Sequence, residues 1–262
     1  MLLVAVTLAG CSNAPVDANS TGFWDRYIIY NAAQFIVWLS NLLGGNYGVG
    51  IIAFTVLVRV LIFPLSAISM KNMTKQSEIA PQLKALQQKY SAKDPETQEK
   101  LREETQKLNA EAGVNPVMGC LPVLIQMPFL LALYQAIFRT NVLKSGTFLW
   151  MQLGKPDPLL ITVILAAILT GLTSYMSMLA QPQANSMTWI MTLAMPVFIF
   201  VIALKLPSAV TIYWVVTNAF SLVQQLLLQN PFKLRREREE RAQAAKDKER
   251  AKRRAYKKAL RK

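Results

Sequence analysis

The sequence predicts an all-α integral membrane protein with five transmembrane helices, its N-terminus outside the cell and its C-terminus in the cytoplasm. Of the 262 residues, 53% are hydrophobic, yet the formal net charge is +14. One soluble domain rarely combines both properties, because apolar side chains need a dry core and charges need water. The charges are instead segregated along the chain: residues 230–262 hold 15 basic and 5 acidic residues, and residues 71–111 hold 8 and 7.

Five apolar segments are long enough to cross a bilayer, whose hydrocarbon core takes about 20 residues of helix. Inside lipid, an isolated segment satisfies its backbone groups only as a helix. The predicted spans are about 49–69, 117–138, 159–180, 187–204 and 209–229. The Lys/Arg-rich stretches between the first two spans and after the last one predict a cytoplasmic location for both. Five spans then place the N-terminus outside.

The first residues predict a secreted and lipidated N-terminus. Residues 1–10 form an apolar run that is too short to span and is typical of a signal peptide. Leu8-Ala9-Gly10-Cys11 resembles a lipobox, in which the signal is cleaved before the Cys and Cys11 receives a diacylglyceryl group. Residues 11–23 would then be an extracellular tether. No basic residue precedes the run, so a start further upstream and a chance Cys after small residues both stay open.

Two further segments are too polar to span. Residues 24–44 predict an amphipathic helix at the outer interface, with Trp and Tyr at headgroup depth. Residues 71–112 predict a charged cytoplasmic hairpin of two helices, with a turn at Asp94-Pro95 that also starts the second helix. The hairpin pattern fits a docking or capping element and a solvated linker equally well. Residues 45–229 would form the core, and residues 230–262 a basic tail.

Arg59 lies near the middle of the first predicted span, where an Arg is unfavourable by about 2.5–3.5 kcal/mol. The other spans contain no Asp or Glu, so Arg59 must face water or uncharged polar groups unless tilt lifts it to one interface. A single Ser or Thr in a span does not by itself indicate a cavity, because its hydroxyl can donate to a backbone carbonyl of its own helix. The polar or amphipathic residues predicted to share a hydrated cavity with Arg59 are Thr55, Gln126, Thr170, Ser174, Tyr213, Trp214 and Asn218.

The residue types exclude several kinds of chemistry. The chain has no His, which rules out His acid–base catalysis and His metal sites, and two Cys cannot form a zinc ribbon. No Walker A or other nucleotide-binding loop is present. We therefore expect a protein without cofactor or metal that is not an enzyme and offers a passive polar site inside the bilayer. An ion channel or small-solute transporter is the alternative, although no inverted repeat is evident.

Residues 45–229 resemble the YidC/Oxa1/Alb3 family of membrane protein insertases, and the N-terminal Cys resembles the Gram-positive, SpoIIIJ/OxaA-like lipoprotein form. The motifs that carry the resemblance are Thr55-Val-Leu-Val-Arg59 with Pro64, Asn115-Pro116-Val-Met-Gly-Cys120-Leu-Pro122, Leu124-Ile-Gln126-Met-Pro128, Met195-Pro196, and Leu206-Pro207-Ser208 through Tyr213-Trp214 and Asn218. The resemblance implies a five-helix bundle around a groove that opens to the cytoplasm and to lipid. The family's groove Arg falls on Arg59, and its substrate contacts fall on Thr55, on Thr170 or Ser174, and on Trp214.

The resemblance also implies a bacterial plasma-membrane insertase and chaperone that acts on nascent membrane proteins, alone or with the Sec translocon. The tail resembles those that approach the ribosome, and the hairpin resembles a mobile element needed for function. Membrane lipids are further expected partners and DNA is not. A membrane anchor that binds RNA through its tail is a rival reading, but acidic residues interrupt the tail's basic ones, and Tyr256 is the only stacking aromatic after Phe232 at its start. A tail that is merely solvated also stays open.

Overall fold

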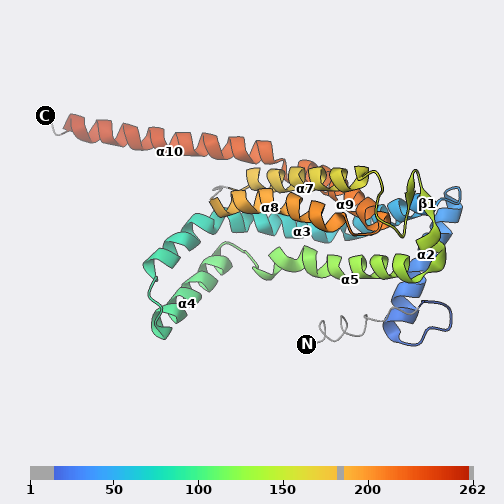
Figure 1. Cartoon of the computed structure of the whole chain (residues 1–262). Helices are drawn as coiled ribbons and strands as arrows, with labels where there is room; N and C mark the ends of the chain where they lie inside the picture. The colour runs from blue at the N-terminus through green and yellow to red at the C-terminus, as the bar shows by residue number, and fades with distance from the viewer. Residues whose placement is uncertain (1–14, 182–185, 260–262) are drawn as a thin grey trace.

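Helices form nearly all of the regular structure in the computed structural model, which describes residues 15–181 and 186–259 (Figure 1). The only strands among these residues are β1 (Thr147–Phe148) and β2 (Met151–Gln152), a small antiparallel ribbon. The chain is thus mostly helical, as predicted. The predicted signal peptide and Cys11 lie outside the described residues.

The first helical segment coincides with the predicted amphipathic helix. A π-helical turn, η1 (Trp24–Ile29), continues into α2 (Tyr30–Leu42). One face, with Ile29 and Ile36 fully buried, packs against α3 (Tyr47–Lys89) and α5 (Val117–Arg139). Large side chains such as Trp38 remain exposed on the helix. Its place at the membrane interface stays a prediction.

Helix α3 differs from expectation because it joins the first predicted span to the first helix of the hairpin without a break at residue 70. The side chain of Asn46 caps its start by accepting from Gly48 N and Val49 N. No Gly or Pro occurs between residues 65 and 80, so nothing in that stretch ends the helix. With 43 residues, α3 is about 65 Å long and must project well beyond a bilayer.

The second half of the hairpin begins where the sequence predicts. Helix α4 (Pro95–Glu111) has Pro95 in its first turn, and Asp94 Oδ2 accepts from Thr97 N at 2.9 Å. It packs back against α3 and, with the end of α3, projects from one end of the molecule (Figure 1). The hairpin is therefore an extension of the bundle and has no buried core residue in α4.

The bundle consists of the apolar part of α3 with α5, α7 (Ile161–Leu179), α8 (Ser186–Ala203) and α9 (Ser208–Gln229). Helix α9 packs on α3 and α7, while α7 also packs on α8. In the described part of the chain, four helices (α3, α5, α7 and the one that starts at Ser208) are long and apolar enough to cross a membrane. Within α8 the apolar stretch Thr188–Ala203 is shorter, so five spans remain a prediction.

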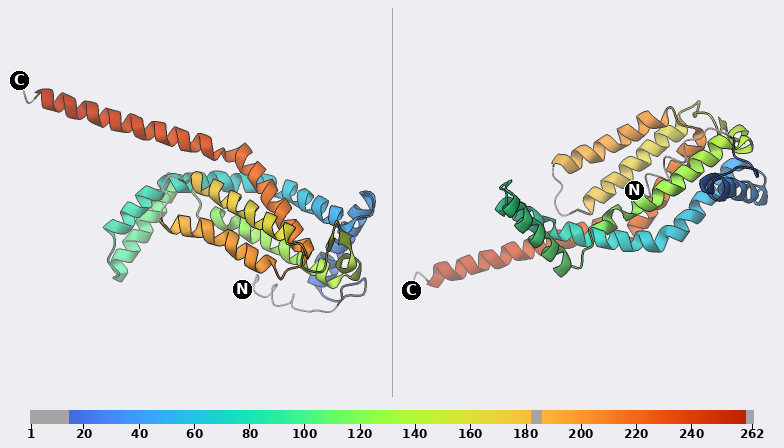
Figure 2. Two further views of the ribbon diagram at one scale, coloured as in Figure 1. Left: turned by 45° about the horizontal axis from the view of Figure 1, so that its top comes forward. Right: turned by 90° about the horizontal axis from the view of Figure 1, so that it is seen from below.

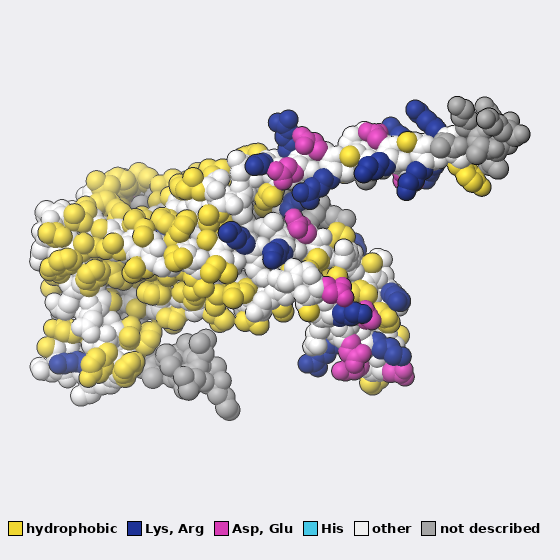
Figure 3. Space-filling view, turned by 180° about the vertical axis from the view of Figure 1, so that it is seen from behind, with side chains coloured by type: hydrophobic (Ala, Val, Ile, Leu, Met, Phe, Trp, Pro, Cys, Tyr) yellow, Lys and Arg dark blue, Asp and Glu magenta, His cyan; other side chains and the backbone are white. Residues whose placement is uncertain are grey.

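The two ends of the bundle differ. The hairpin and α10 (Pro231–Ala259) carry most of the charge and extend from one end, whereas the body is mainly hydrophobic on its surface (Figures 2 and 3). At the opposite end a packed core includes Leu133, Ile137, the α6 (Asn141–Ser145) residue Leu143, and Leu153, all fully buried. One end of the bundle is thus closed by packing.

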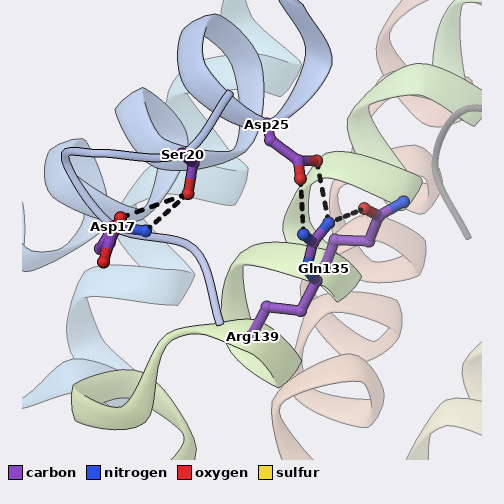
Figure 4. Close-up of polar contacts among 5 residues, drawn as sticks. All are labelled: Asp17, Ser20, Asp25, Gln135 and Arg139. Atoms are coloured by element: carbon purple, nitrogen blue, oxygen red, sulfur yellow. Dashed lines mark hydrogen bonds and ion pairs between the residues drawn. The ribbon is translucent and has the colours of Figure 1, made fainter. Parts of the chain in front are cut away.

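An ion pair ties η1 to the last turn of α5 at this closed end. Arg139 Nη1 donates to Asp25 Oδ1 at 2.9 Å, and Nη2 donates to Oδ2 at 2.6 Å. Gln135 Oε1 accepts a further bond from Arg139 Nη1 at 3.1 Å (Figure 4). The fork of the guanidinium thus matches both carboxylate oxygens.

Candidate functional site

Arg59 belongs to a polar group formed by three helices. Gln126 of α5 donates its amide to the hydroxyl of Tyr213 in α9, and Arg59 of α3 interacts electrostatically with Tyr213. Arg59 is half-buried, and among the described side chains it forms no ion pair. Among the described residues, the charge inside the bundle therefore interacts with the Tyr213 hydroxyl group, which Gln126 contacts, and forms no ion pair with a carboxylate.

Thr55, one turn before Arg59, does not extend this group toward open space. It is 1% exposed, and its hydroxyl donates to Ile51 O at 2.7 Å. Thr170 of α7 likewise donates to Ala166 O at 2.8 Å. Both hydroxyls are thus satisfied within their own helices, which is common for Thr in transmembrane helices.

A second polar group lines an open hollow of about 590 Å³ between α7, α8 and α9. Ser174 and Asn218 both face it, and the Thr173 hydroxyl lies 3.2 Å from Asn218 Oδ1. Among the described residues, none that lines the hollow is charged. The remaining lining consists of Ser177, Gln181, Thr188, Thr192, Ser221, Gln225 and three methionines.

An adjoining hollow of about 340 Å³ lies nearer the charged end. It shares Ser177, Gln181 and Gln225 with the first, and the extension of α3 forms its other wall. Gln225 Nε2 donates to Ser177 Oγ at 3.0 Å, and Gln229 donates to Met70 O and Thr74 Oγ1. Hydroxyls, amides and methionines therefore line a path from the charged end into the bundle.

The geometry of α9 explains why the predicted residues form two groups. Tyr213 and Asn218 are five residues apart, which separates them by about 140° around the helix axis. Tyr213 accordingly faces α3 and α5, whereas Asn218 faces α7. Trp214 is half-buried against the packed core, and Arg59 is not among the residues lining the two hollows. The structure thus brings Arg59, Gln126 and Tyr213 together, and separately Ser174 and Asn218.

Several lining residues were missed by the sequence prediction although their spacing contains a signal. Ser221 and Gln225 are four apart on α9, and Ser174 and Ser177 are three apart on α7. Such spacing places each pair on one helix face. Within the described residues no group of three or more His, Cys, Asp or Glu comes together, so the site offers no metal centre there.

Comparison with known proteins identifies relatives of this chain. The model of a family described as 60Kd inner membrane protein matches residues 38–237. The chain is 53% identical over 255 residues to a membrane protein insertase YidC of Enterococcus faecalis, covering 97% of this chain and 92% of that protein. It is 51% identical to a membrane protein insertase YidC 2 of Lactiplantibacillus plantarum, covering 93% and 88%.

A solved structure is also similar. The crystal structure of an active YidC insertase with its first transmembrane domain resolved superposes with a TM-score of 0.59 at 27% identity. The match covers 85% of this chain and 49% of that one, so this chain spans about half of its length. From the family match, the identities and the shared fold it follows that the chain belongs to the 60Kd inner membrane protein family, together with the YidC insertases that its motifs resemble.

Proposed function

We propose that this chain is a membrane protein insertase and chaperone that inserts nascent membrane proteins and helps them fold, without nucleotide hydrolysis. Relatives at about half identity carry the name membrane protein insertase. The structural observation that carries the proposal is Arg59, a charge half-buried among neutral polar groups inside a bundle with open polar hollows. Such an interior suits a transient polar guest better than a chemical reaction.

The polar lining suggests how a client chain could enter. A polar or acidic segment moves into the bundle from the charged end, where hydroxyls and amides of residues such as Ser174 and Asn218 replace part of its lost water. Arg59 attracts the acidic groups of that segment from deeper in the bundle. The client's apolar segment then leaves sideways into lipid, where its burial drives release.

The distribution of charge supports the predicted orientation. Lys and Arg gather on the hairpin and α10 at one end (Figure 3), and such residues are enriched in cytoplasmic segments. We infer five spans in a bacterial plasma membrane, with an N-terminus outside that is lipidated at Cys11 and a cytoplasmic tail. The ribosome, through α10 and the hairpin, and the Sec translocon are the partners that this orientation favours.

The closed end favours an insertase over an ion channel or small-solute transporter. Conduction needs a continuous polar path, whereas Leu133, Ile137 and Leu143 are fully buried in the packed core at one end. A polar cavity that is closed on one side can still receive part of a polypeptide. Ion flux through the purified protein in vesicles would contradict this preference.

The test is insertion of defined clients in cells depleted of their own insertase. Clients should differ only in whether the segment that crosses the membrane is acidic or neutral. We expect Arg59→Lys to retain most insertion and Arg59→Ala to lose most insertion of acidic clients, because only the first keeps a cation. Arg26→Ala, which removes an exposed Arg outside the bundle interior, is the matched control.

Two results would count against the proposal. Full insertion of acidic clients by Arg59→Ala would refute the role of the charge. Failure of the folded, unaltered chain to insert any client would refute the insertase function itself.

A further inference from the structure

Two leucines near the closed end have an unusual backbone conformation. Leu149 and Leu160 have φ values of 53° and 58°, and they are the only non-glycine residues with positive φ in the described part of the chain. Bulky L-residues rarely adopt this conformation, because Cβ approaches the following carbonyl. Both side chains are nevertheless exposed, at 70% and 37%. These large apolar groups thus stay exposed in an unfavourable backbone conformation, which other contacts must stabilise.

A buried carboxylate fixes the two turns that carry these leucines. Asp157 is 2% exposed, and its Oδ1 accepts from Trp150 Nε1 at 2.9 Å and from Leu159 N at 3.0 Å. Its Oδ2 accepts from Thr162 N at 2.8 Å and from Thr162 Oγ1 at 2.7 Å. Because one carboxylate binds both turns, they lie side by side. Their exposed residues, here named the outer leucine patch, are Leu149, Trp150, Leu159 and Leu160.

The position of α7 sets the depth of the outer leucine patch. The helix starts at Ile161, directly after the patch, and exposes Ile164 and Ile168 along its length. Its 19 residues span about 28 Å, close to the hydrocarbon thickness of about 30 Å. The patch therefore lies where the hydrocarbon core ends, at the depth where Trp side chains are enriched.

The surroundings of the patch are basic. Lys144, Lys155 and Lys205 are exposed in the segments at this end of the molecule. Of the described carboxylates at this end, Asp157 is buried, Asp25 is paired with Arg139, and the exposed Asp17 accepts from Asn19 N and Ser20 Oγ. None of these three lysines forms an ion pair with a described carboxylate. Apolar side chains next to such lysines complement a lipid interface, in which acyl chains lie beneath anionic phosphates.

We propose that the outer leucine patch inserts into the outer interface of the host bilayer, with the leucines at upper acyl-chain depth and the lysines near lipid phosphates. Asp157 holds the two turns in the shape that this insertion needs. The patch thereby anchors the closed end of the bundle at the membrane surface. The opposite end, with the hairpin and α10, takes no part in this contact.

Depth-dependent quenching tests the proposal on the full chain in vesicles. Cys11 and Cys120 are replaced by Ser, and an environment-sensitive nitrobenzoxadiazole dye is attached to Leu149→Cys, Leu160→Cys or, as the matched control in the same loop, Lys155→Cys. Vesicles contain phosphatidylglycerol and phosphatidylcholine brominated in the upper acyl chain. We expect at least two-fold stronger quenching by bromine at 149 and 160 than at 155, and the reverse order for aqueous iodide.

Equal iodide access at all three positions, with no bromine quenching at 149 or 160, would overturn the proposal. Leu159→Cys gives a second reporter that does not depend on a left-handed residue, in case a labelled variant misfolds. Bromine quenching at position 149 should be stronger in these anionic vesicles than in vesicles of phosphatidylcholine alone. Replacing Lys144, Lys155 and Lys205 by Gln should abolish that gain. An unchanged gain would overturn the assignment of the lysines to lipid phosphates.

Discussion

Asn72 in α3 and Asn115, just before α5, are joined by two hydrogen bonds. Asn72 Nδ2 donates to Asn115 O at 2.7 Å, and Asn115 N donates to Asn72 Oδ1 at 2.9 Å. One turn earlier, Ser69 Oγ donates to Met118 O at 2.6 Å. These contacts fix the base of the hairpin to the bundle, so Asn115 of the recognised motif has a structural role.

Replacing Asn72 by Ala should loosen the base of the hairpin. The change removes both bonds and leaves the backbone N–H and C=O of Asn115 without these partners, which we expect to cost about 1–3 kcal/mol. Limited proteolysis at the exposed turn of residues 91–94 should be faster, and the melting temperature in detergent should fall. Gln87→Ala, an exposed change on the same helix, should alter neither. Equal proteolysis of both variants would contradict a clamp.

Removing one partner of the ion pair between Asp25 and Arg139 should destabilise the closed end. The Arg139 side chain is 4% exposed and that of Asp25 is 18% exposed, so Asp25→Ala leaves a buried cation without its carboxylate. The free energy of unfolding should fall by about 2–4 kcal/mol. This is less than the full cost of breaking a wholly buried pair, because Gln135 still accepts a hydrogen bond from Arg139. Denaturant titration in detergent measures it. Glu96→Ala breaks the exposed pair with Lys100 and should change stability by less than about 0.5 kcal/mol.

The apolar segments and the capping signal at Asp94 are local features, and the sequence predicts them well. The helices begin or end close to the expected positions because hydrophobic length and turn residues determine them. The continuity of α3 was missed because the change from apolar to charged residues near Lys71 marks a change of environment and not an end of helix. A pattern of polarity does not by itself break backbone hydrogen bonds.

The site could be predicted only in part. The unusual position of Arg59 is visible in the sequence, but its partners depend on which faces of α5 and α9 meet. Asp25 and Arg139 are 114 residues apart, and no local sequence pattern predicts their ion pair. Gln126 contacts Tyr213, which interacts with Arg59, whereas Thr55 and Thr170 bond within their own helices. The shared cavity of these residues stays a prediction. Helix packing, which sequence periodicity does not specify, decides these outcomes.

Acid should weaken the contribution of Asp157 to stability. Burial opposes ionisation of this carboxyl, but hydrogen bonds from Thr162, Trp150 and Leu159 outweigh it, so its pKa lies below the ordinary value. A group whose pKa is lowered by folding stabilises fully above its unfolded pKa of about 3.9 and loses that contribution as pH falls through the folded pKa. The difference in melting temperature between the unaltered chain and Asp157→Asn should thus be largest near pH 7. It should shrink below about pH 4, and a difference independent of pH would contradict this assignment.

The basic residues of α10 differ in how far they are already neutralised. Arg235 and Arg236 pair with Glu239 and Glu240 at 2.8 and 3.0 Å. Within the described part of α10, six exposed basic residues farther along belong to no ion pair, and four of them lie toward its C-terminal end. These four are Lys248, Arg250, Lys252 and Arg254. If the tail contacts ribosomal RNA, the free cations should contribute more than the paired ones.

Changing these four free cations to Gln should therefore weaken co-sedimentation with ribosomes more than Arg235→Gln with Arg236→Gln does. Each phosphate contact contributes to the salt dependence of binding, so the slope of log affinity against log salt should fall by roughly 3 for the four-fold variant. Deleting residues 231–262 should abolish the salt-dependent component. If all three proteins sediment alike across the salt series, the tail is a solvated helix, and the ribosome contact must be sought on the hairpin instead.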